Sequence, residues 1–212
     1  MSKTLRIVAI SDTHAQHRAV DVPDGDVLIH AGDMTRHGDL DEVRDLNDFL
    51  GGLPHRVKLV IAGNHDFCFQ DDREQAAALL SNCVYLQDEA FEFDGLAIWG
   101  SPWQPWFHDW AFNLERGAAL RAKWDLIPAG TDILITHGPP AGHGDRTARG
   151  EAVGCRDLLE AVERLRPRLH VFGHIHEAAG VTRNEHTTFV NACSCDLRYR
   201  PSLPAIVHEL SV

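Results

Sequence analysis

The sequence predicts an α/β fold, or α+β in some schemes, in which two β-sheets pack together and helices lie outside them. Two observations support this prediction. Short apolar runs of the kind that form buried strands alternate with segments in which apolar residues recur at helical spacing. Further short runs lie close together in the middle of the chain and near its end. Because the chain has 212 residues, of which 44% are hydrophobic, we expect one domain over residues 1–212.

Five of the apolar runs share a second feature, because each is followed by Asp, Asn or His. In chain order, LRIVAI precedes SDTH, VLIH precedes AGD, VKLVIA precedes GNHD, DILI precedes THG, and LHVF precedes GHIH. Strands joined by helical crossovers form largely parallel sheets, and ligands bind beyond the carboxyl ends of such strands. All five polar clusters therefore lie where a ligand site is expected.

Two helical patterns lie between these runs. Residues 40–50 have apolar side chains at helical spacing, with Asp39 or Asp41 as the N-cap and Gly51 as the stop. Residues 158–165 show the same spacing before a proline breaks it. Both segments are expected to cover a sheet.

The middle of the chain holds three short apolar runs, at residues 84–86, 91–93 and 96–99. Their close, turn-separated spacing predicts antiparallel strands or a meander. Residues 187–190 and 205–210 are expected to form two closing strands.

The net charge limits the possible binding partners, and the cysteine content indicates the cellular compartment. A formal net charge of -11 argues against binding to extended nucleic acid, although a locally positive metal site would still admit a small anionic substrate. The first apolar run is too short for a signal peptide, and no run is long enough to span a membrane. The five cysteines are scattered, so we expect reduced thiols and a cytoplasmic protein. The sequence leaves open whether the chain forms a homodimer.

The last of the five runs ends in Gly173 and two histidines, His174 and His176. Side chains two residues apart in a strand point to the same side, so both histidines reach one locus if the extended backbone continues past Gly173. The alternative is two surface histidines on a turn. Other metal-ligand residues at the same place favour the first interpretation.

The five clusters supply seven candidate metal ligands, all of them carboxylate, amide or imidazole donors. They are Asp12, His14, Asp33, Asn64, His137, His174 and His176. Such a set suits manganese, iron or zinc rather than a closed structural zinc site. Seven donors exceed the four of one tetrahedral ion but fit two ions that share a bridging carboxylate, so we expect a two-metal hydrolytic centre.

The motifs DTH, GDMT, GNHD, THG and GHIH, in this order at strand ends, resemble the signature of the calcineurin-like metallophosphoesterase superfamily. The segments VGCRDLLEAV, HVFGHIHEA and GSPWQPWFHDWAFNLERG resemble its metallophosphoesterase-domain subfamily, which is related to class III cyclic nucleotide phosphodiesterases. The likeness spans nearly the whole chain. It implies a four-layer sandwich of two packed mixed β-sheets flanked by helices.

The resemblance also implies a role for each candidate ligand. One metal ion would be held by Asp12, His14, Asp33 and His176, and the other by Asp33, Asn64, His137 and His174, with Asp33 as the bridge. His65, which follows Asn64, would protonate the leaving oxygen.

The charges suit phosphodiester hydrolysis, because two divalent ions outweigh two aspartates and leave a surplus of positive charge. Metal ions also lower the pKa of bound water towards about 7, which supplies hydroxide for in-line attack on phosphorus. We therefore expect a metal-dependent phosphodiesterase that acts on small phosphodiesters, with cyclic nucleotides as the class suggested by resemblance. The alternatives are a phosphomonoesterase and a non-catalytic binding scaffold on the same fold.

One position departs from the pattern that the resemblance implies. Many phosphatases of the superfamily carry an acidic residue where this chain has Arg36, and the protein phosphatase pattern GDxVDRG is absent. A protein phosphatase is therefore disfavoured, and the partner of His65 stays open. A carboxylate such as Asp66 or Asp39 is a candidate for stabilising the protonated imidazole.

Four further residues are weaker candidates for contact with substrate: Arg36, Trp103, Trp106 and Arg146. An aromatic wall formed by the tryptophans would stack on a nucleobase, but packing of a rigid loop over the core is the favoured interpretation. For the arginines, a solvated surface position is favoured.

Overall fold

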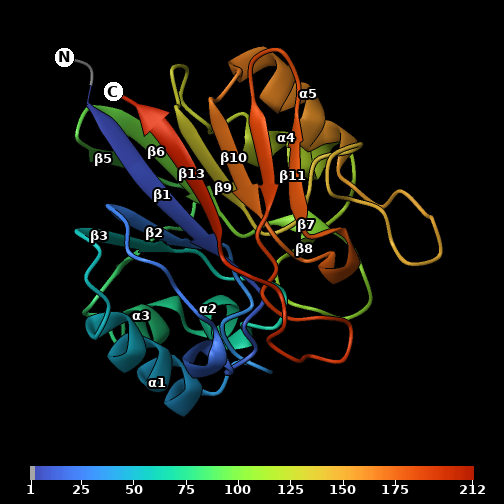
Figure 1. Cartoon of the computed structure of the whole chain (residues 1–212). Helices are drawn as coiled ribbons and strands as arrows, with labels where there is room; N and C mark the ends of the chain where they lie inside the picture. The colour runs from blue at the N-terminus through green and yellow to red at the C-terminus, as the bar shows by residue number, and fades with distance from the viewer. Residues whose placement is uncertain (1–2) are drawn as a thin grey trace.

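The computed structural model describes residues 3–212, whose strands form two mixed sheets packed face to face (Figure 1). The first sheet has the strand order β13 (Ile206–Ser211), β1 (Thr4–Ile10), β2 (Val27–His30), β3 (Val57–Val60) and β4 (Val84–Tyr85). The second has the order β11 (Gly180–Arg183), β12 (Thr188–Asn191), β10 (Leu169–Phe172), β9 (Ile133–Thr136), β6 (Leu96–Ser101) and β5 (Glu89–Phe93). A small separate ladder joins β7 (Gln104–Pro105) to β8 (Asn113–Leu114).

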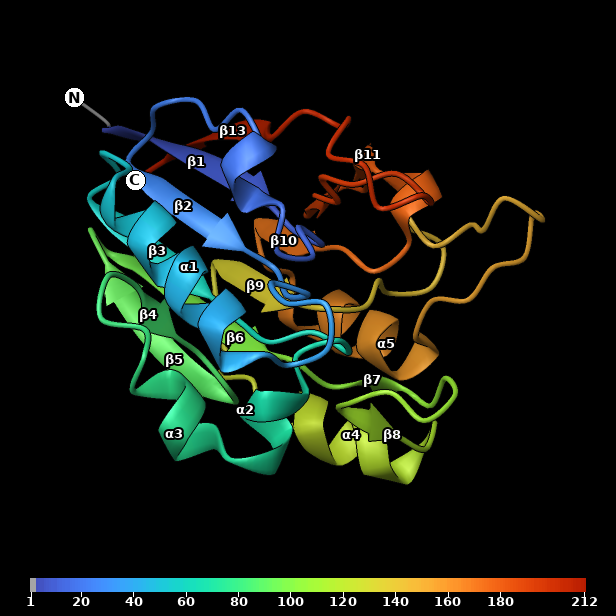
Figure 2. The same cartoon turned by 90° about the horizontal axis from the view of Figure 1, so that it is seen from below.

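Helices cover the outer face of each sheet, which makes four layers (Figure 2). Over the first sheet lie α1 (Leu40–Gly51), α2 (Phe67–Asp71) and α3 (Arg73–Ala77). Over the second lie α4 (Ala118–Trp124) and α5 (Arg156–Leu165), and two short 3₁₀ helices, η1 (His17–Ala19) and η2 (His176–Ala178), lie in loops. The four-layer arrangement of mixed sheets and flanking helices confirms the expected fold class. No helix among residues 3–212 has the length and apolar character needed to cross a bilayer.

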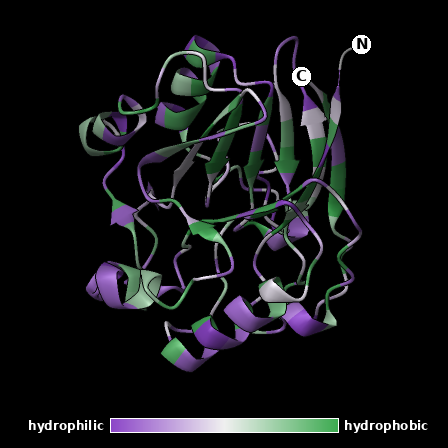
Figure 3. Cartoon of the chain, turned by 90° about the vertical axis from the view of Figure 1, so that its left-hand side faces the viewer, coloured by the Kyte–Doolittle hydropathy of each residue, from purple (hydrophilic) through white to green (hydrophobic). Residues whose placement is uncertain are grey.

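The largest core cluster lies between the two sheets, and each sheet has a second cluster beneath its helices. Strand β1 shows how the alternation of the pleat divides these clusters: Ile7 packs between the sheets, whereas Val8 and Ile10 pack towards the helices. All three side chains are fully buried. Figure 3 shows that the strands of both sheets are predominantly hydrophobic, while the helices carry much of the hydrophilic surface.

Helix boundaries follow the expected signals closely. The Asp39 carboxylate caps α1 by accepting a 2.7 Å hydrogen bond from the Asp41 backbone N–H, and the helix extends through Gly51 rather than stopping before it. Helix α5 begins two residues earlier than its apolar pattern and ends where Arg166 adopts a φ of 55°. A left-handed residue at this position is a common way to end a helix.

The expected meander in the middle of the chain is only partly present. Strands β5 and β6 form an antiparallel hairpin, but β4 pairs in parallel with β3 and therefore belongs to the other sheet. Leu86, which follows β4, is buried between the sheets as the chain passes from one to the other. Two paired residues carry too little pattern to reveal which sheet they join. The two closing strands also separate, since β12 lies parallel to β10 and β13 antiparallel to β1.

Candidate metal centre

The backbone turns sharply at the carboxyl ends of β1, β2 and β10, where candidate ligands follow the strands. Asp12, His14, Asp33 and His174 have φ values of 53°, 44°, 55° and 69°. Left-handed backbone is unfavourable for residues other than glycine and persists where surrounding contacts hold it. Here the Asp12 N–H donates to the Gly32 carbonyl at 2.9 Å, and the His14 N–H donates to the Asp33 carbonyl at 3.0 Å. The two loops of the first sheet therefore fix each other.

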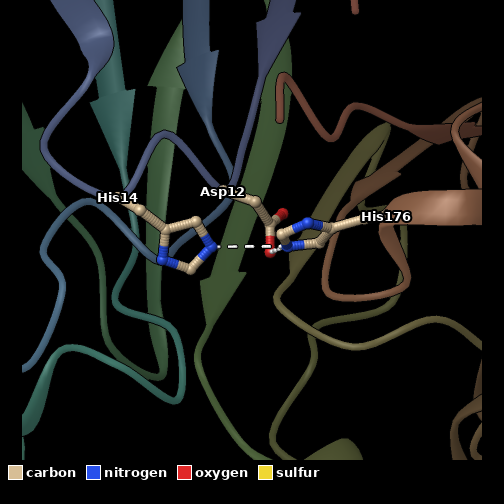
Figure 4. A group of neighbouring side chains, drawn as sticks. All are labelled: Asp12, His14 and His176. Carbon is tan, nitrogen blue, oxygen red and sulfur yellow. Dashed lines mark hydrogen bonds and ion pairs between the residues drawn. The ribbon is translucent and has the colours of Figure 1, made fainter. Parts of the chain in front are cut away.

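Asp12, His14 and His176 form the first group of donors, with ligand atoms close enough to share an ion (Figure 4). His176 Nε2 lies 3.3 Å from Asp12 Oδ1, and it also lies 3.3 Å from His14 Nε2. Asp12 and His14 come from the loop after β1, whereas His176 comes from the second sheet's loop after β10. The group therefore joins the two sheets.

Asp12, Asp33 and His137 form a second group, and Asn64 adjoins it. His137 Nε2 lies 3.5 Å from Asp33 Oδ1 and 2.8 Å from Asn64 Oδ1. The other oxygen of Asp33 lies 3.9 Å from His14 Nε2. The two carboxylate oxygens of Asp33 thus face different sets of imidazoles.

Backbone carbonyls orient two of these imidazoles by accepting hydrogen bonds from their Nδ1 atoms. His137 Nδ1 is 3.0 Å from the Ala31 carbonyl, and His176 Nδ1 is 3.0 Å from the Asp196 carbonyl. Because a carbonyl only accepts, each Nδ1 carries the hydrogen and each Nε2 is left free to bind a cation.

His174 and His176 do not share the extended geometry that was expected of them. Strand β10 ends at Phe172, His174 is left-handed, and His176 begins η2. The His174 ring lies 5.0 Å from the His137 ring, so the two histidines diverge towards different groups. The condition of continued strand geometry is not met, because the backbone leaves the strand after Phe172, but both histidines line the cavity over Asp33 and His65. Both histidines are half-buried, and His176 lies in the single turn of η2.

The charge balance of the site tests whether cations fit it. Burial raises the pKa of Asp33 well above its usual value, and the nearby carboxylates of Asp12 and Asp66 raise it further. Burial also opposes ionisation of Asp12, but the hydrogen bond from His176 and the neighbouring histidines outweigh it and hold its pKa well below normal. Two buried carboxylates this close are stable as anions only with a positive partner. The residues therefore fit metal ions.

The histidine protonation states agree with a ligand role for most of the set. Burial lowers the pKa of His14 and of His174 to about 3, so both are neutral at pH 7. Burial also disfavours the charged form of His176, but its hydrogen bond with Asp12 and the charge of that residue raise its pKa to about 9. A cation beside Asp12 would replace the proton of His176.

His65 forms a further group with His14 and Asp33, with its Nε2 3.9 Å from Asp33 Oδ2. Its Nδ1 is 2.7 Å from the Arg36 backbone carbonyl, and its ring lies on that of Trp110 with centroids 4.1 Å apart. The Arg36 side chain is 68% exposed and turns towards Glu42. The partner of the His65 ring is therefore the main chain of Arg36.

The two carboxylates proposed as partners of His65 have other roles. Asp66 accepts hydrogen bonds from the backbone N–H groups of Gly63, Met34 and Thr35, and thereby joins the loops after β2 and β3. Asp39 caps α1. Neither is a hydrogen-bond partner of the His65 ring. The negative charge of Asp66 nevertheless favours the protonated ring, because it raises the pKa of His65 against the larger, lowering effect of burial.

Three residues near the centre were not identified as site residues from the sequence. Tyr199 is 47% exposed, and its ring centroid lies 4.6 Å from that of His14. With Gln16, Arg36 and His65 it lines a cavity of about 320 Å³. Trp110 supports His65, and the Cys193 thiol donates to Asp12 Oδ2 at 3.1 Å. Tyr199 and Cys193 follow β12, distant in sequence from the motifs, and no local pattern indicates their approach.

The weaker candidates for contact with substrate lie in different parts of the structure. Trp103 packs against the core, and its indole N–H donates to Asp88 Oδ2 at 2.9 Å, as the favoured interpretation expected. Trp106 is 57% exposed, so packing over the core is wrong for this ring. Arg146 donates to the Gly150 carbonyl within its own loop, which projects from the molecule in Figure 2.

Comparison with known proteins agrees with this fold. The family model for calcineurin-like phosphoesterases matches residues 5–178. The chain is 47% identical to human metallophosphoesterase domain-containing protein 1, over 97% of this chain and 71% of that protein. It is 44% identical to a UPF0046 protein of Caenorhabditis elegans, over 97% of this chain and 81% of that protein.

A solved structure of an archaeal phosphodiesterase has the same fold, with a TM-score of 0.52 and 15% sequence identity. The match covers 98% of this chain and 99% of that one. Membership of the family implies a metal-dependent phosphoester hydrolase. On the family match and the close relatives, the chain belongs to the calcineurin-like phosphoesterase family.

Proposed function

We propose that the protein is a dinuclear metal-dependent phosphodiesterase that hydrolyses small phosphodiesters. One observation carries the proposal: the two oxygens of Asp33 face separate donor groups, one at 3.9 Å from His14 Nε2 and one at 3.5 Å from His137 Nε2. A carboxylate between two groups of imidazoles is what a bridge between two ions requires. The archaeal neighbour supports the reaction class, because the same fold carries phosphodiester hydrolysis there.

Each donor then has a proposed place. Asp12, His14 and His176 would hold one ion and Asn64, His137 and His174 the other, with Asp33 shared. The oxygen and imidazole donors suit manganese, iron or zinc. When bound, such ions supply Lewis acidity towards a phosphoryl oxygen and activate water as a nucleophile.

The chain's own residues orient the proton donor. Because His65 Nδ1–H donates to the Arg36 carbonyl, Nε2 is the atom left to exchange a proton. Burial lowers the pKa of His65, which makes the charged ring a readier acid once it forms. We propose that Nε2 protonates the leaving oxygen while Trp110 keeps the ring in place.

The test combines metal analysis of the purified protein with hydrolysis of a panel of substrates. The panel pairs bis(p-nitrophenyl) phosphate with p-nitrophenyl phosphate and adds cyclic and linear nucleotide diesters. We expect two first-row ions per chain and preference for diesters, lost with a chelator and restored with manganese. Preference for the monoester would favour a phosphomonoesterase, and bound metal without turnover on any substrate would favour a binding scaffold.

The proposed partner is a small phosphodiester, with cyclic nucleotides as the first class to try. The net charge of -11 argues against extended nucleic acid, and the cavity beside His65 suits a small molecule. We propose the cytoplasm as the compartment on the basis of cysteine usage. A homodimer is an open alternative that sedimentation would decide.

A further inference from the structure

A second cavity of about 320 Å³ lies beside the metal centre, and two aromatic side chains line it at the surface. Trp106 is 57% exposed and Phe107 is 51% exposed. Exposure of two adjacent large aromatic rings costs hydrophobic free energy and commonly marks a binding site. The proposed phosphodiester chemistry at the ions does not use either ring.

The segment that carries these rings is held in a fixed shape. The backbone N–H of Trp106 donates to the backbone carbonyl of Leu114 at 2.9 Å, which continues the small ladder between β7 and β8. The Asn113 side chain closes the loop, since its Nδ2 donates to the His108 carbonyl at 2.8 Å and its Oδ1 accepts from the Phe107 N–H at 3.3 Å. The rings are thus presented by a hydrogen-bonded loop between the parallel strands β7 and β8.

The rest of the cavity lining, which includes Arg116, Val153 and Glu177, is also fixed by hydrogen bonds. The Arg116 guanidinium donates to the carbonyls of Val153 and Gly154, at 2.8 and 2.9 Å. Glu177 accepts a 2.6 Å hydrogen bond from the Ala148 N–H. These contacts fix the loop after β9 against Arg116 and Glu177, so the cavity is formed before any ligand enters.

The cavity adjoins the candidate metal centre, because two residues line both. His174, a proposed ligand, and Phe107 line both this cavity and the smaller one over Asp33 and His65. The His174 and Phe107 ring centroids lie 6.2 Å apart, nearly perpendicular. An organic substituent of a phosphate at the ions would reach this cavity by extending past Phe107 and His174.

We propose that this cavity binds a planar aromatic substituent of the phosphate ester and that Trp106 determines specificity by stacking on it. The inference rests on the proposed function in that the phosphate is taken to occupy the metal centre. The occupant is a flat ring rather than a long acyl chain, because two exposed aromatic rings, those of Trp106 and Phe107, line the cavity. Ring stacking tolerates many planar groups, so the proposal names a class of substituent.

The experiment uses the manganese-loaded protein and three phosphonates that cannot be hydrolysed: phenyl-, cyclohexyl- and ethylphosphonate. They share the anionic head and differ in a planar ring, a bulky ring without π-faces and a short chain. Affinity is measured twice, by calorimetry and by inhibition of bis(p-nitrophenyl) phosphate hydrolysis. We expect phenylphosphonate to bind about tenfold more tightly than ethylphosphonate, with cyclohexylphosphonate between them.

Two substitutions and one control assign the preference to the cavity. Trp106→Ala should remove the preference for the planar ring, and Trp106→Phe should retain part of it. Leu126→Ala is the control, because Leu126 is 51% exposed but does not line the cavity. Equal affinity for all three phosphonates, or a preference that survives Trp106→Ala, would overturn the proposal.

The calorimetric arm separates this inference from the proposed function. A preference for the planar ring that depends on Trp106, in a protein that hydrolyses no diester, would support the cavity and refute the phosphodiesterase. Hydrolysis of diesters without any such preference would do the reverse.

Discussion

The Asp33 carboxylate is the residue on which both donor groups depend. Its two oxygens lie 3.9 Å from His14 Nε2 and 3.5 Å from His137 Nε2, and its side chain is almost wholly buried. A change that keeps its shape but removes its charge therefore acts on both proposed ions at once.

Asp33→Asn is expected to lower bound metal and to reduce diester hydrolysis at least about 100-fold, since it removes a shared anionic ligand. The apoprotein should melt at or above the wild-type temperature, because burial already disfavours this carboxylate as an anion. Metal content by mass spectrometry and melting in chelator measure the two effects. Asp45→Asn, which alters a half-exposed carboxylate beside Arg18, is the control for metal content. Unchanged metal content and rate in Asp33→Asn would refute the bridge.

Substitution of His65 distinguishes a role in proton transfer from a role in metal binding. If Nε2 protonates the leaving oxygen, His65→Gln should slow a cyclic nucleotide by about 10² to 10⁴-fold and slow an activated aryl diester noticeably less. Bound metal should be retained. Rates on the two substrates, together with metal content, measure this.

Arg36→Ala is the matched control, because the main chain of Arg36, not its side chain, accepts from His65. This variant should keep the wild-type ratio of rates on the two substrates, even if both rates change. Equal losses on both substrates in His65→Gln, with a fall in metal, would mean that His65 supports the metal site instead.

At the scale of elements, the turn after β10 brings the backbone close to the loop after β1. A Cβ added at Gly173 would lie 2.0 Å from Asp12 Oδ2 and 2.2 Å from Ser11 Oγ. Non-bonded atoms cannot approach so closely, so only glycine fits at position 173 of this turn.

Gly173→Ala is therefore expected to displace Asp12, to lower metal content and to destabilise the fold by about 1–3 kcal/mol, the usual cost of overpacking. Gly52→Ala is the control, since the nearest atom to its added Cβ is the Phe49 carbonyl oxygen at 3.5 Å. Urea unfolding and metal analysis of both variants provide the measurements. Native metal content in Gly173→Ala would show that the turn can relax without moving Asp12.

The elements also show how far sequence reasoning extends. Apolar runs such as Val27–His30 and Leu169–Phe172 have the predicted bounds, because a buried parallel strand is uniformly apolar and its polar ligand residues begin where burial of the strand ends. The sheet of β4 was not predictable, because two residues have no period. The left-handed turn at His174 was not predictable either, since it depends on contacts with Asp12, which is distant in sequence. Only the family resemblance assigned His174 and His176 to different ions.

At the scale of the whole molecule, both sheets supply donors to one centre, and we propose that residues 1–212 fold as one domain. A second consequence of the shared core is that several histidines are buried away from the centre. His170 on β10 is fully buried, and its Nε2 lies 2.8 Å from Thr136 Oγ1. Its Nδ1 has no hydrogen-bond partner within the described chain.

Burial lowers the pKa of His170 to about 3, well below its unfolded value of about 6.5. Between these values the unfolded state binds a proton that the folded state does not, so stability present above pH 6.5 is lost as the pH falls. His170→Gln keeps a donor for Thr136 but cannot titrate. From pH 7.5 to 5.0 in chelator, wild type should lose about 2 kcal/mol more unfolding free energy than this variant. Equal losses in urea titrations would contradict the assignment.

The pairing of the chain's two ends has a practical consequence. Lys3 and Val212 exchange backbone hydrogen bonds of 3.2 and 2.7 Å, and both ends lie side by side in Figure 1. They lie where β1 begins, whereas Asp12 follows the other end of this seven-residue strand, roughly 20 Å away. A tether attached to either end would leave from the side opposite the metal centre. Protein immobilised on a surface by such a tether would present the candidate metal centre to solution, whichever end was used.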